Sequence, residues 1–220
     1  MSEPGTTEDY SEFAAEIADQ VESFLVALRE IARGDDPGST LSLLLLEVSQ
    51  LVLAGGRLGA IVDVVPPEEY EPDAGFDPDL AELRERLAGL LGPVDDYVEV
   101  FDPVVAPAEV VPYRLSDDLT DIAGDLLHGL QHYRAGDTVE ALWWWQFSYL
   151  SHWGNHATAA LRGLHSLIAH TRLDAELDPE TQAEQELLVD VAAEAVERVW
   201  AIRECSPRNA AVAWFPQWLR

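Results

Sequence analysis

The sequence has no lysine and only one cysteine. Its 13 basic residues are all arginine, and they face 41 aspartates and glutamates, so the formal net charge of the 220-residue chain is −28. The single Cys205 excludes an internal disulfide framework and suits a reducing cytoplasm. So acidic a surface repels phosphate backbones and anionic headgroups, which argues against nucleic acids and membranes as partners.

Targeting signals and common catalytic motifs are also missing. The N-terminal residues MSEPGTTEDYSEF have neither a cationic start nor an apolar run, so no signal peptide is expected. Residues 41–54 are the most apolar stretch, but polar residues interrupt them, and they predict a buried helix rather than a membrane span. The chain contains no G-x-S-x-G and no H-E-x-x-H. No catalytic residue and no cofactor can therefore be assigned.

Apolar residues recur at helical spacing along most of the chain. They predict helices over residues 11–33, 40–55, 79–91, 117–134, 138–153 and 180–204, with the fifth reaching 172 if Gly154 is tolerated inside it. Ser11 and Ser116 are the expected N-caps of the first and fourth helices. Residues 94–101 suggest another helical turn, and Val104-Val105 and Val110-Val111 a short strand pairing. The prediction is an all-α fold, a single-domain helical bundle or irregular array of about six or seven helices.

Three parts are expected along the chain. Residues 1–10 form a flexible acidic tail, and residues 11–173 form the helical domain, which includes a proline-rich acidic loop over residues 62–78. Residues 174–220 supply a C-terminal helix and an apolar tail that packs on the domain or on a partner. The apolar run at 211–219 is the reason for expecting such a contact.

Residues 141–173 contain no aspartate or glutamate, yet hold four of the seven tryptophans and four of the six histidines. Because desolvation excludes carboxylates from a core, this stretch predicts the buried axis of the bundle. The alternative is the floor of a site. In that case Trp144, Trp145 and Trp153 are candidates to contact a ligand or partner. Arg162 would receive an anionic group, unless it anchors a core ion pair.

Two H-x-x-x-H pairs, His128/His132 and His152/His156, place histidines one helical turn apart, where each pair could chelate a metal. With about 1.5 Å rise per residue, the pairs lie at different levels of a hairpin that turns at Gly136. A site made of all four histidines is therefore not expected.

The carboxylates level with the second pair are Asp117 and Asp121. Together, His152, His156, Asp117 and Asp121 form a candidate site for iron, manganese or zinc. The alternative is that the two histidines are partly buried and hydrogen-bonded to these aspartates or to the backbone.

Two resemblances are visible. The hairpin over residues 117–153 is similar to a single tetratricopeptide repeat in the spacing of its small, turn and aromatic residues, although no second copy follows. The run over 133–167, with the stretches at 16–28, 44–60 and 116–136, resembles a family of uncharacterised actinobacterial helical proteins classed as a domain of unknown function. This resemblance covers about residues 13–172. It implies a helical cytoplasmic domain and assigns no catalytic residue.

Three functions remain open from the sequence. The leading hypothesis is a non-catalytic protein-interaction or scaffold protein of the bacterial cytoplasm, which binds a protein partner or self-associates. The second is a metal-binding protein or metal-dependent enzyme that uses the two-His/two-Asp site. The third is a small-ligand binder with a tryptophan-lined pocket.

Overall fold

The computed structural model describes residues 7–34, 36–67, 71–76, 78–100, 104, 107 and 110–173. The chain divides into two compact units, Met1–Leu173 and Asp174–Arg220, and the second lies outside the described residues. The predicted C-terminal helix and apolar tail therefore also lie outside them.

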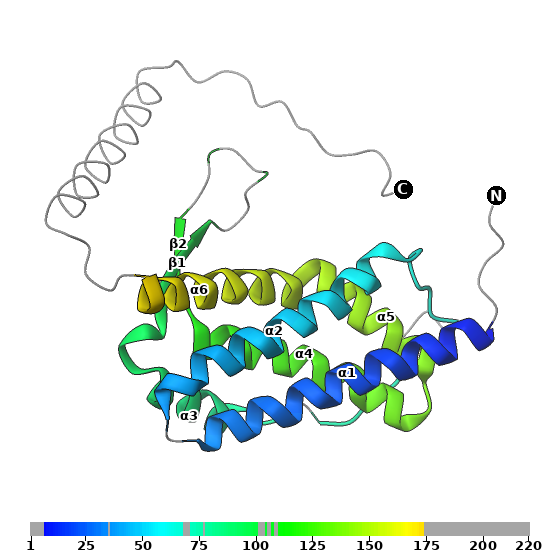
Figure 1. Ribbon diagram of the computed structural model, residues 1–220. Helices are drawn as coiled ribbons and strands as arrows, with labels where there is room; N and C mark the ends of the chain where they lie inside the picture. The colour runs from blue at the N-terminus through cyan, green and yellow to red at the C-terminus, as the bar shows by residue number, and fades with distance from the viewer. Residues whose placement is uncertain are drawn as a thin grey trace, which may run out of the picture. The chain divides into compact units, whose positions relative to one another are not determined.

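The described residues are mostly helical and confirm the all-α class (Figure 1). In chain order the elements are α1 (Thr7–Arg33), α2 (Pro37–Ala60), α3 (Ala81–Leu91), the 3-10 turn η1 (Gly92–Val94), β1 (Asp96–Val100), β2 (Val110–Arg114), α4 (Leu115–Ala135), α5 (Thr138–Ser148), the π-helical turn η2 (Tyr149–Trp153) and α6 (Gly154–Leu173). Tyr149 and Gly154 both have right-handed helical dihedrals, so α5, η2 and α6 form one continuous helix. The described residues thus contain five separate helical rods, slightly fewer than expected.

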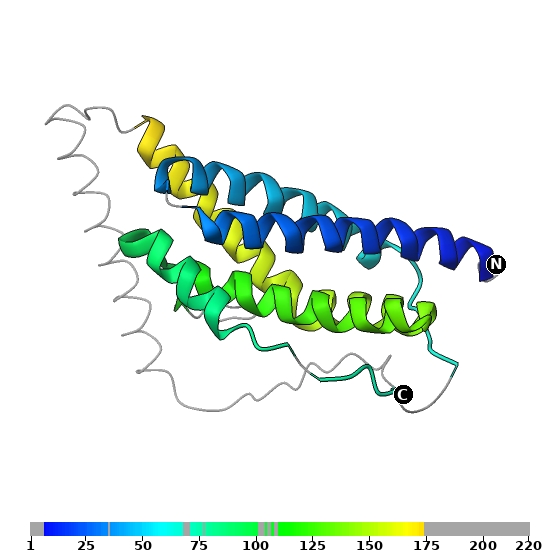
Figure 2. The same cartoon turned by 90° about the horizontal axis from the view of Figure 1, so that it is seen from below.

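The helices pack in two layers joined by α6. Helix α1 packs on α2, and α4 packs on α3 and α5. Figure 2 shows α6 crossing obliquely between these layers, where it contacts both α2 and α4. The largest fully buried side chains come from both layers and include Leu28, Leu58, Leu126, Trp145 and Trp153. The carboxylate-free stretch is thus buried where it begins, whereas His165 and His170 near its end are exposed.

Helix α1 begins at Thr7 rather than at Ser11. Tyr10 packs against the core and continues the apolar face of the helix by one turn toward the N-terminus, which accounts for the earlier start. The turn expected at Gly136 is confirmed. Gly136 ends α4 with a φ of 96°, a left-handed conformation that glycine adopts without strain.

The antiparallel pair β1–β2 corrects two predictions. Residues 96–100 form a strand instead of a helical turn, and Val110-Val111 pair with Val100 and Glu99 rather than with Val104-Val105. A five-residue strand carries little local signal, because its hydrogen bonds go to a partner elsewhere in the chain. Pro112 is tolerated since a two-stranded sheet consists of edge strands.

The hairpin also supplies the cap of α4. Buried Asp95, just before β1, accepts hydrogen bonds from the backbone N and the Oγ of Ser116, each 2.8 Å long. The same carboxylate accepts a 2.8 Å hydrogen bond from Nη2 of Arg114. The predicted capping role of Ser116 is therefore wrong, because the helix begins at Leu115. The backbone N–H of Ser116, which has no partner within the helix, is satisfied by the carboxylate of Asp95, 21 residues away in the sequence.

Helix α2 is only partly buried. Its segment Ser39–Ala60 is, among the described residues, the one helix long and apolar enough to cross a membrane by length and composition, a test that core helices of soluble proteins also pass. The bundle buries 33% of its most apolar window. Leu46 and Leu53 remain 53% and 70% exposed, so the expectation of a buried helix over 41–54 holds for one face only.

Candidate functional site: a polar groove along α4

The π-helical turn is held by close packing against glycines. A Cβ atom on Gly55 of α2 would lie 2.3 Å from Cε2 of Tyr149 and 2.7 Å from Cη2 of Trp153. The absence of a side chain at Gly55 therefore lets these rings approach the α2 backbone. Trp153 also donates a 3.2 Å hydrogen bond from Nε1 to the carbonyl of Trp145. Single π-helical turns often mark functional sites, since the extra residue re-aims the following side chains.

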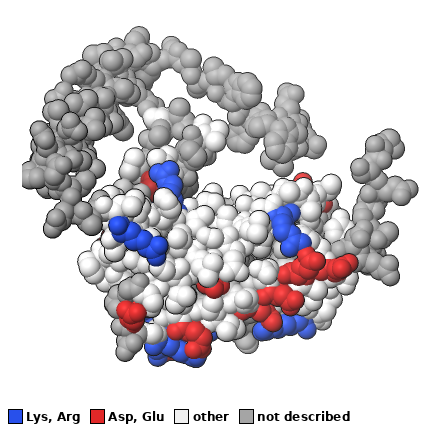
Figure 3. All heavy atoms as spheres, viewed as in Figure 1, with Lys and Arg blue, Asp and Glu red and all other residues white. Residues whose placement is uncertain are grey.

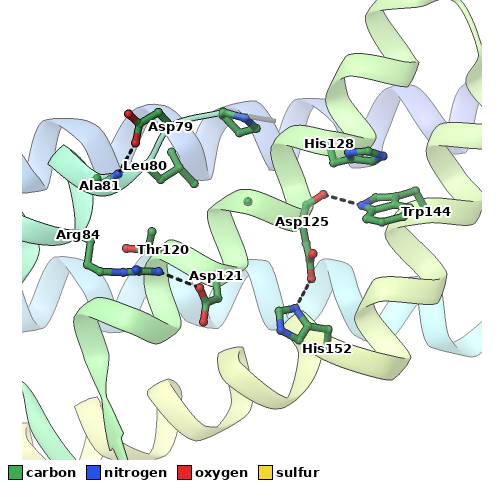
Figure 4. Close-up of a pocket in the computed structure, with 12 residues that line it drawn as sticks. Asp79, Leu80, Ala81, Arg84, Thr120, Asp121, Asp125, His128, Trp144 and His152 are labelled. Atoms are coloured by element: carbon green, nitrogen blue, oxygen red, sulfur yellow. Dashed lines mark hydrogen bonds and ion pairs between the residues drawn. The ribbon is translucent and has the colours of Figure 1, made fainter. Parts of the chain in front are cut away.

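The turn directs His152 toward α4. Its Nδ1 lies 2.7 Å from Oδ2 of Asp125 (Figure 4). Half of the histidine side chain is exposed, against 17% of the aspartate side chain. Burial raises the pKa of Asp125, and the hydrogen bond to His152 opposes that rise. A hydrogen bond from Nδ1–H to the Asp125 carboxylate favours the neutral tautomer that is protonated on Nδ1. In this tautomer, Nε2 of His152 can accept a hydrogen bond from a ligand.

One helical turn later, His156 joins a buried network. Its Nδ1 lies 2.7 Å from Oδ1 of Asp118, and Oδ2 of Asp118 accepts a 2.6 Å hydrogen bond from the hydroxyl of Tyr97. The hydrogen bond to Asp118 raises the pKa of His156, while burial raises the pKa of Asp118. Burial, together with Asp118, raises the pKa of Tyr97. The network ties the hairpin, α4 and α6 together and favours a protonated His156.

An open groove of about 660 Å³ runs along α4 between the start of α3 and the π-helical turn. Its lining includes Asp79, Arg84, Asp121, Asp125, Trp144 and His152 (Figure 4). Arg84 is already bound, at 3.1 Å, by both Asp117 and Asp121. Trp144 donates a 2.9 Å hydrogen bond from Nε1 to the carbonyl of Asp125, which holds the indole beside the carboxylates.

The described structure does not assemble the predicted set of His152, His156, Asp117 and Asp121. The two histidines bind Asp125 and Asp118, whereas Asp117 and Asp121 bind Arg84. The prediction placed the two histidines at nearly the correct height along α4. It did not take into account that successive residues of a helix point about 100° apart. Asp118 and Asp125, seven residues apart, consequently face the π-helical turn and α6, while Asp117 and Asp121 face Arg84 of α3.

The predicted contact residues differ in their access to solvent. Trp145 and Trp153 are buried to within 1% and belong to the core. Trp145 packs against Gly129, where a Cβ atom would lie 2.3 Å from its Nε1. Trp144 is only partly buried and lines the groove. Arg162 forms a 2.9 Å ion pair with Glu99 of β1, but 72% of its side chain is exposed, so the pair is not part of the core.

A further cluster escaped the sequence interpretation. Oε1 of Glu71, in the loop after α2, lies 2.6 Å from Nε2 of His128 and 2.9 Å from Nε2 of His132. Burial alone would raise the pKa of Glu71, but hydrogen bonds from both histidines lower it overall. The H-x-x-x-H spacing had already identified His128 and His132 as a possible metal-binding pair. Nothing in the sequence indicated which of the many acidic residues would reach it.

Residues 8–170 match the family model described as a domain of unknown function, DUF5063. The chain belongs to this family. The match confirms the resemblance to an uncharacterised family. No curated protein matches this DUF5063 chain. The crystal structure of protein BF1032 from Bacteroides fragilis is similar, with a TM-score of 0.58 and 20% sequence identity over 74% of this chain and 94% of that chain. At this identity the likeness shows a common fold and nothing about activity.

Proposed function

We propose that this DUF5063 protein is a ligand-binding protein whose groove takes a small organic cation. The observation that carries the proposal is the lining: three carboxylates (Asp79, Asp121 and Asp125) and an indole ring border the same open space. The arginine among the lining residues, Arg84, pairs with one of these carboxylates, Asp121, and with Asp117, which does not line the groove. The groove therefore presents net negative charge beside an aromatic ring, the combination that binds ammonium groups.

Asp125 and His152 are suited to orient such a ligand. Burial disfavours the ionised form of Asp125, so a cation placed beside it would recover part of the desolvation cost. With Nδ1 of His152 held by Asp125, its Nε2 can accept a hydrogen bond from an ammonium N–H. A ligand with a positive charge and N–H donors fits both groups, whereas an anion would meet carboxylates.

The test uses three probes of equal chain length: 1,4-diaminobutane, 1,4-butanediol and succinate. Calorimetric titration of the full chain should give binding for the diamine and none for the neutral or anionic analogue. Asp125→Asn should weaken diamine binding about tenfold or more, which corresponds to about 1.4 kcal/mol.

The matched control is Asp137→Asn, which removes the same charge at an exposed residue just after α4 that does not line the groove. It should leave the affinity nearly unchanged. Diamine binding no stronger than diol binding, or equal losses in the two variants, would contradict the proposal.

A second candidate function, self-association, is favoured by the exposed apolar side chains of α2 and the turn beside it. Leu43, Leu46, Leu53 and Leu150 are 45 to 70% exposed. Helices α2 and α6 pack together and contain only one carboxylate, Glu47. Figure 3 shows this side as mostly uncharged, with a few separate arginine side chains on it and acidic side chains gathered toward its lower edge. Since two copies with net charge −28 repel each other, an uncharged face is where they can meet.

Sedimentation of the full chain over a range of concentrations tests this candidate. Dimer formation should be abolished by Leu46→Asp and unaffected by Phe76→Asp, which adds the same charge at a side chain 97% exposed on the loop after α2. A monomer at every concentration would exclude a second copy as the occupant of this face.

A further inference from the structure

We propose that Glu71, His128 and His132 bind one divalent first-row transition-metal ion, such as Zn²⁺, through three protein ligands. This site borders the groove, which His128 also lines, and it goes beyond the binding of an organic cation there. It also differs from the two-His/two-Asp set expected from the sequence. Within the described part of the chain, these residues form the group of three histidine and acidic side chains close enough to share an ion.

The geometry brings three ligand atoms to one point. His128 and His132 lie one turn apart on α4, and their ring centroids are 5.1 Å apart in an edge-to-face arrangement. Both Nε2 atoms face the same carboxylate oxygen of Glu71, at 2.6 and 2.9 Å. All three ligand atoms lie within 4.8 Å of one another.

The donor set is chemically selective. Two imidazoles and one carboxylate are the ligands of many catalytic zinc sites and of non-haem iron(II) sites, whereas Mg²⁺ and Ca²⁺ prefer oxygen alone. Metal–ligand bonds of about 2.1 Å hold neighbouring ligand atoms about 3.0 to 3.4 Å apart. The carboxylate oxygen of Glu71 must therefore retreat by about 0.4 to 0.8 Å from Nε2 of His128, and by about 0.1 to 0.5 Å from Nε2 of His132, to admit the ion.

Two ligands are held in place and the third can adjust. His132 is completely buried, and the ring of His128 packs on Trp144 with centroids 4.0 Å apart. The side chain of Glu71 is 35% exposed in the loop after α2, where a small shift disturbs no core packing. Because three protein ligands leave a coordination position for water or a ligand, this arrangement matches open rather than purely structural metal sites.

The surroundings of His132 limit the expected affinity. Its Nδ1 is buried and has no hydrogen-bond partner among the described residues. A metal-bound histidine normally donates its second N–H to a neighbouring acceptor, and loss of such a partner weakens metal binding about 10- to 100-fold. We therefore expect affinity in the micromolar rather than the nanomolar range.

The competing interpretation is a clamp in which the two imidazoles donate hydrogen bonds to Glu71 and hold the acidic loop on α4. Both interpretations predict that the cluster stabilises the loop, but only the metal site predicts stoichiometric Zn²⁺. The experiment therefore measures metal directly, on the full chain purified without an affinity tag and stripped with a chelator.

Calorimetry with Zn²⁺ at neutral pH should give one ion per chain, and Co²⁺ should produce the visible absorption of a low-symmetry site with nitrogen and oxygen ligands. Glu71→Gln and His128→Gln should each weaken binding by about tenfold or more, with the helical circular dichroism unchanged. Binding should also weaken at acidic pH, because protons compete for the imidazoles.

The matched controls are His152→Gln and His156→Gln, which disrupt the other H-x-x-x-H pair. Both should retain Zn²⁺ and the Co²⁺ spectrum. Absence of Zn²⁺ binding by the unaltered chain would overturn the proposal. So would binding that survives Glu71→Gln and His128→Gln but is lost in the controls.

Discussion

Adjacent glycines of α2, Gly55 and Gly56, provide a direct test of how the π-helical turn is positioned. A methyl group at residue 55 would lie 2.3 Å from the ring of Tyr149 and 2.7 Å from that of Trp153. At residue 56, a Cβ atom would meet nothing within 4 Å. Both glycines lie inside α2, so replacing either one by alanine should raise the helix propensity by the same amount, about 0.5 to 1 kcal/mol.

The difference between Gly55→Ala and Gly56→Ala therefore isolates the steric cost. Carbon atoms pack best at about 3.5 to 4.0 Å, so the rings must move by more than an ångström to accept the methyl group. Overpacking of this kind costs about 1 to 3 kcal/mol. Gly56→Ala should be slightly more stable than the unaltered protein, and Gly55→Ala should be less stable than Gly56→Ala by about 1 to 3 kcal/mol.

Urea denaturation followed by far-ultraviolet circular dichroism measures both free energies of unfolding. For a chain of this length the same difference corresponds to about 2 to 12 °C in melting temperature. Gly55→Ala should also weaken diamine binding, because displacement of Tyr149 moves His152 in the same turn. If the two variants are equally stable to within about 0.5 kcal/mol, α2 does not position the π-helical turn and the reasoning fails.

Three further outcomes are expected in urea denaturation. Asp95→Ala should cost about 1 to 3 kcal/mol because it leaves the buried first turn of α4 without its acceptor, while Asp96→Ala, at a side chain 80% exposed, should change stability by less than about 0.5 kcal/mol. Gln146→Leu should cost about 1 to 3 kcal/mol, since the buried amide bonds two carbonyls and one N–H at the end of α2. Because the folded pKa of His156 is raised, its contribution is full below the unfolded value of about 6.5 and is lost as pH rises through the folded pKa. The stability of the unaltered protein relative to His156→Gln should therefore fall as the pH rises above about 6.5, and a constant difference would contradict the assigned pair.

Local patterns predicted most of the helices. The apolar spacing of α1, α3, α4 and α5 and the turn at Gly136 could be interpreted one segment at a time, because each helix satisfies its backbone internally. The β-hairpin could not, since strands pair with a partner elsewhere in the chain. The capping carboxylate of Asp95 was missed for the same reason: it reaches α4 from outside the helix.

The candidate site was likewise predicted from the sequence only in part. The histidine pairs on α4 and on the π-helical turn are visible in the sequence because both members of each pair belong to one helix. Their carboxylate partners were not predicted. Helical rotation gave Asp118 and Asp125, rather than Asp117 and Asp121, to His156 and His152.

By itself, the sequence determined a helical, strongly acidic, lysine-free chain with two spaced histidine pairs, since these properties depend on composition and on contacts a few residues apart. Only the tertiary structure decided which charged groups meet. It brought Glu71 to His128 and His132 across 57 and 61 residues of sequence, and it left Trp144, rather than Trp145 or Trp153, beside the groove. The physical reason is that such meetings depend on helix rotation and on where a loop crosses a helix, and both are set by packing of the whole bundle.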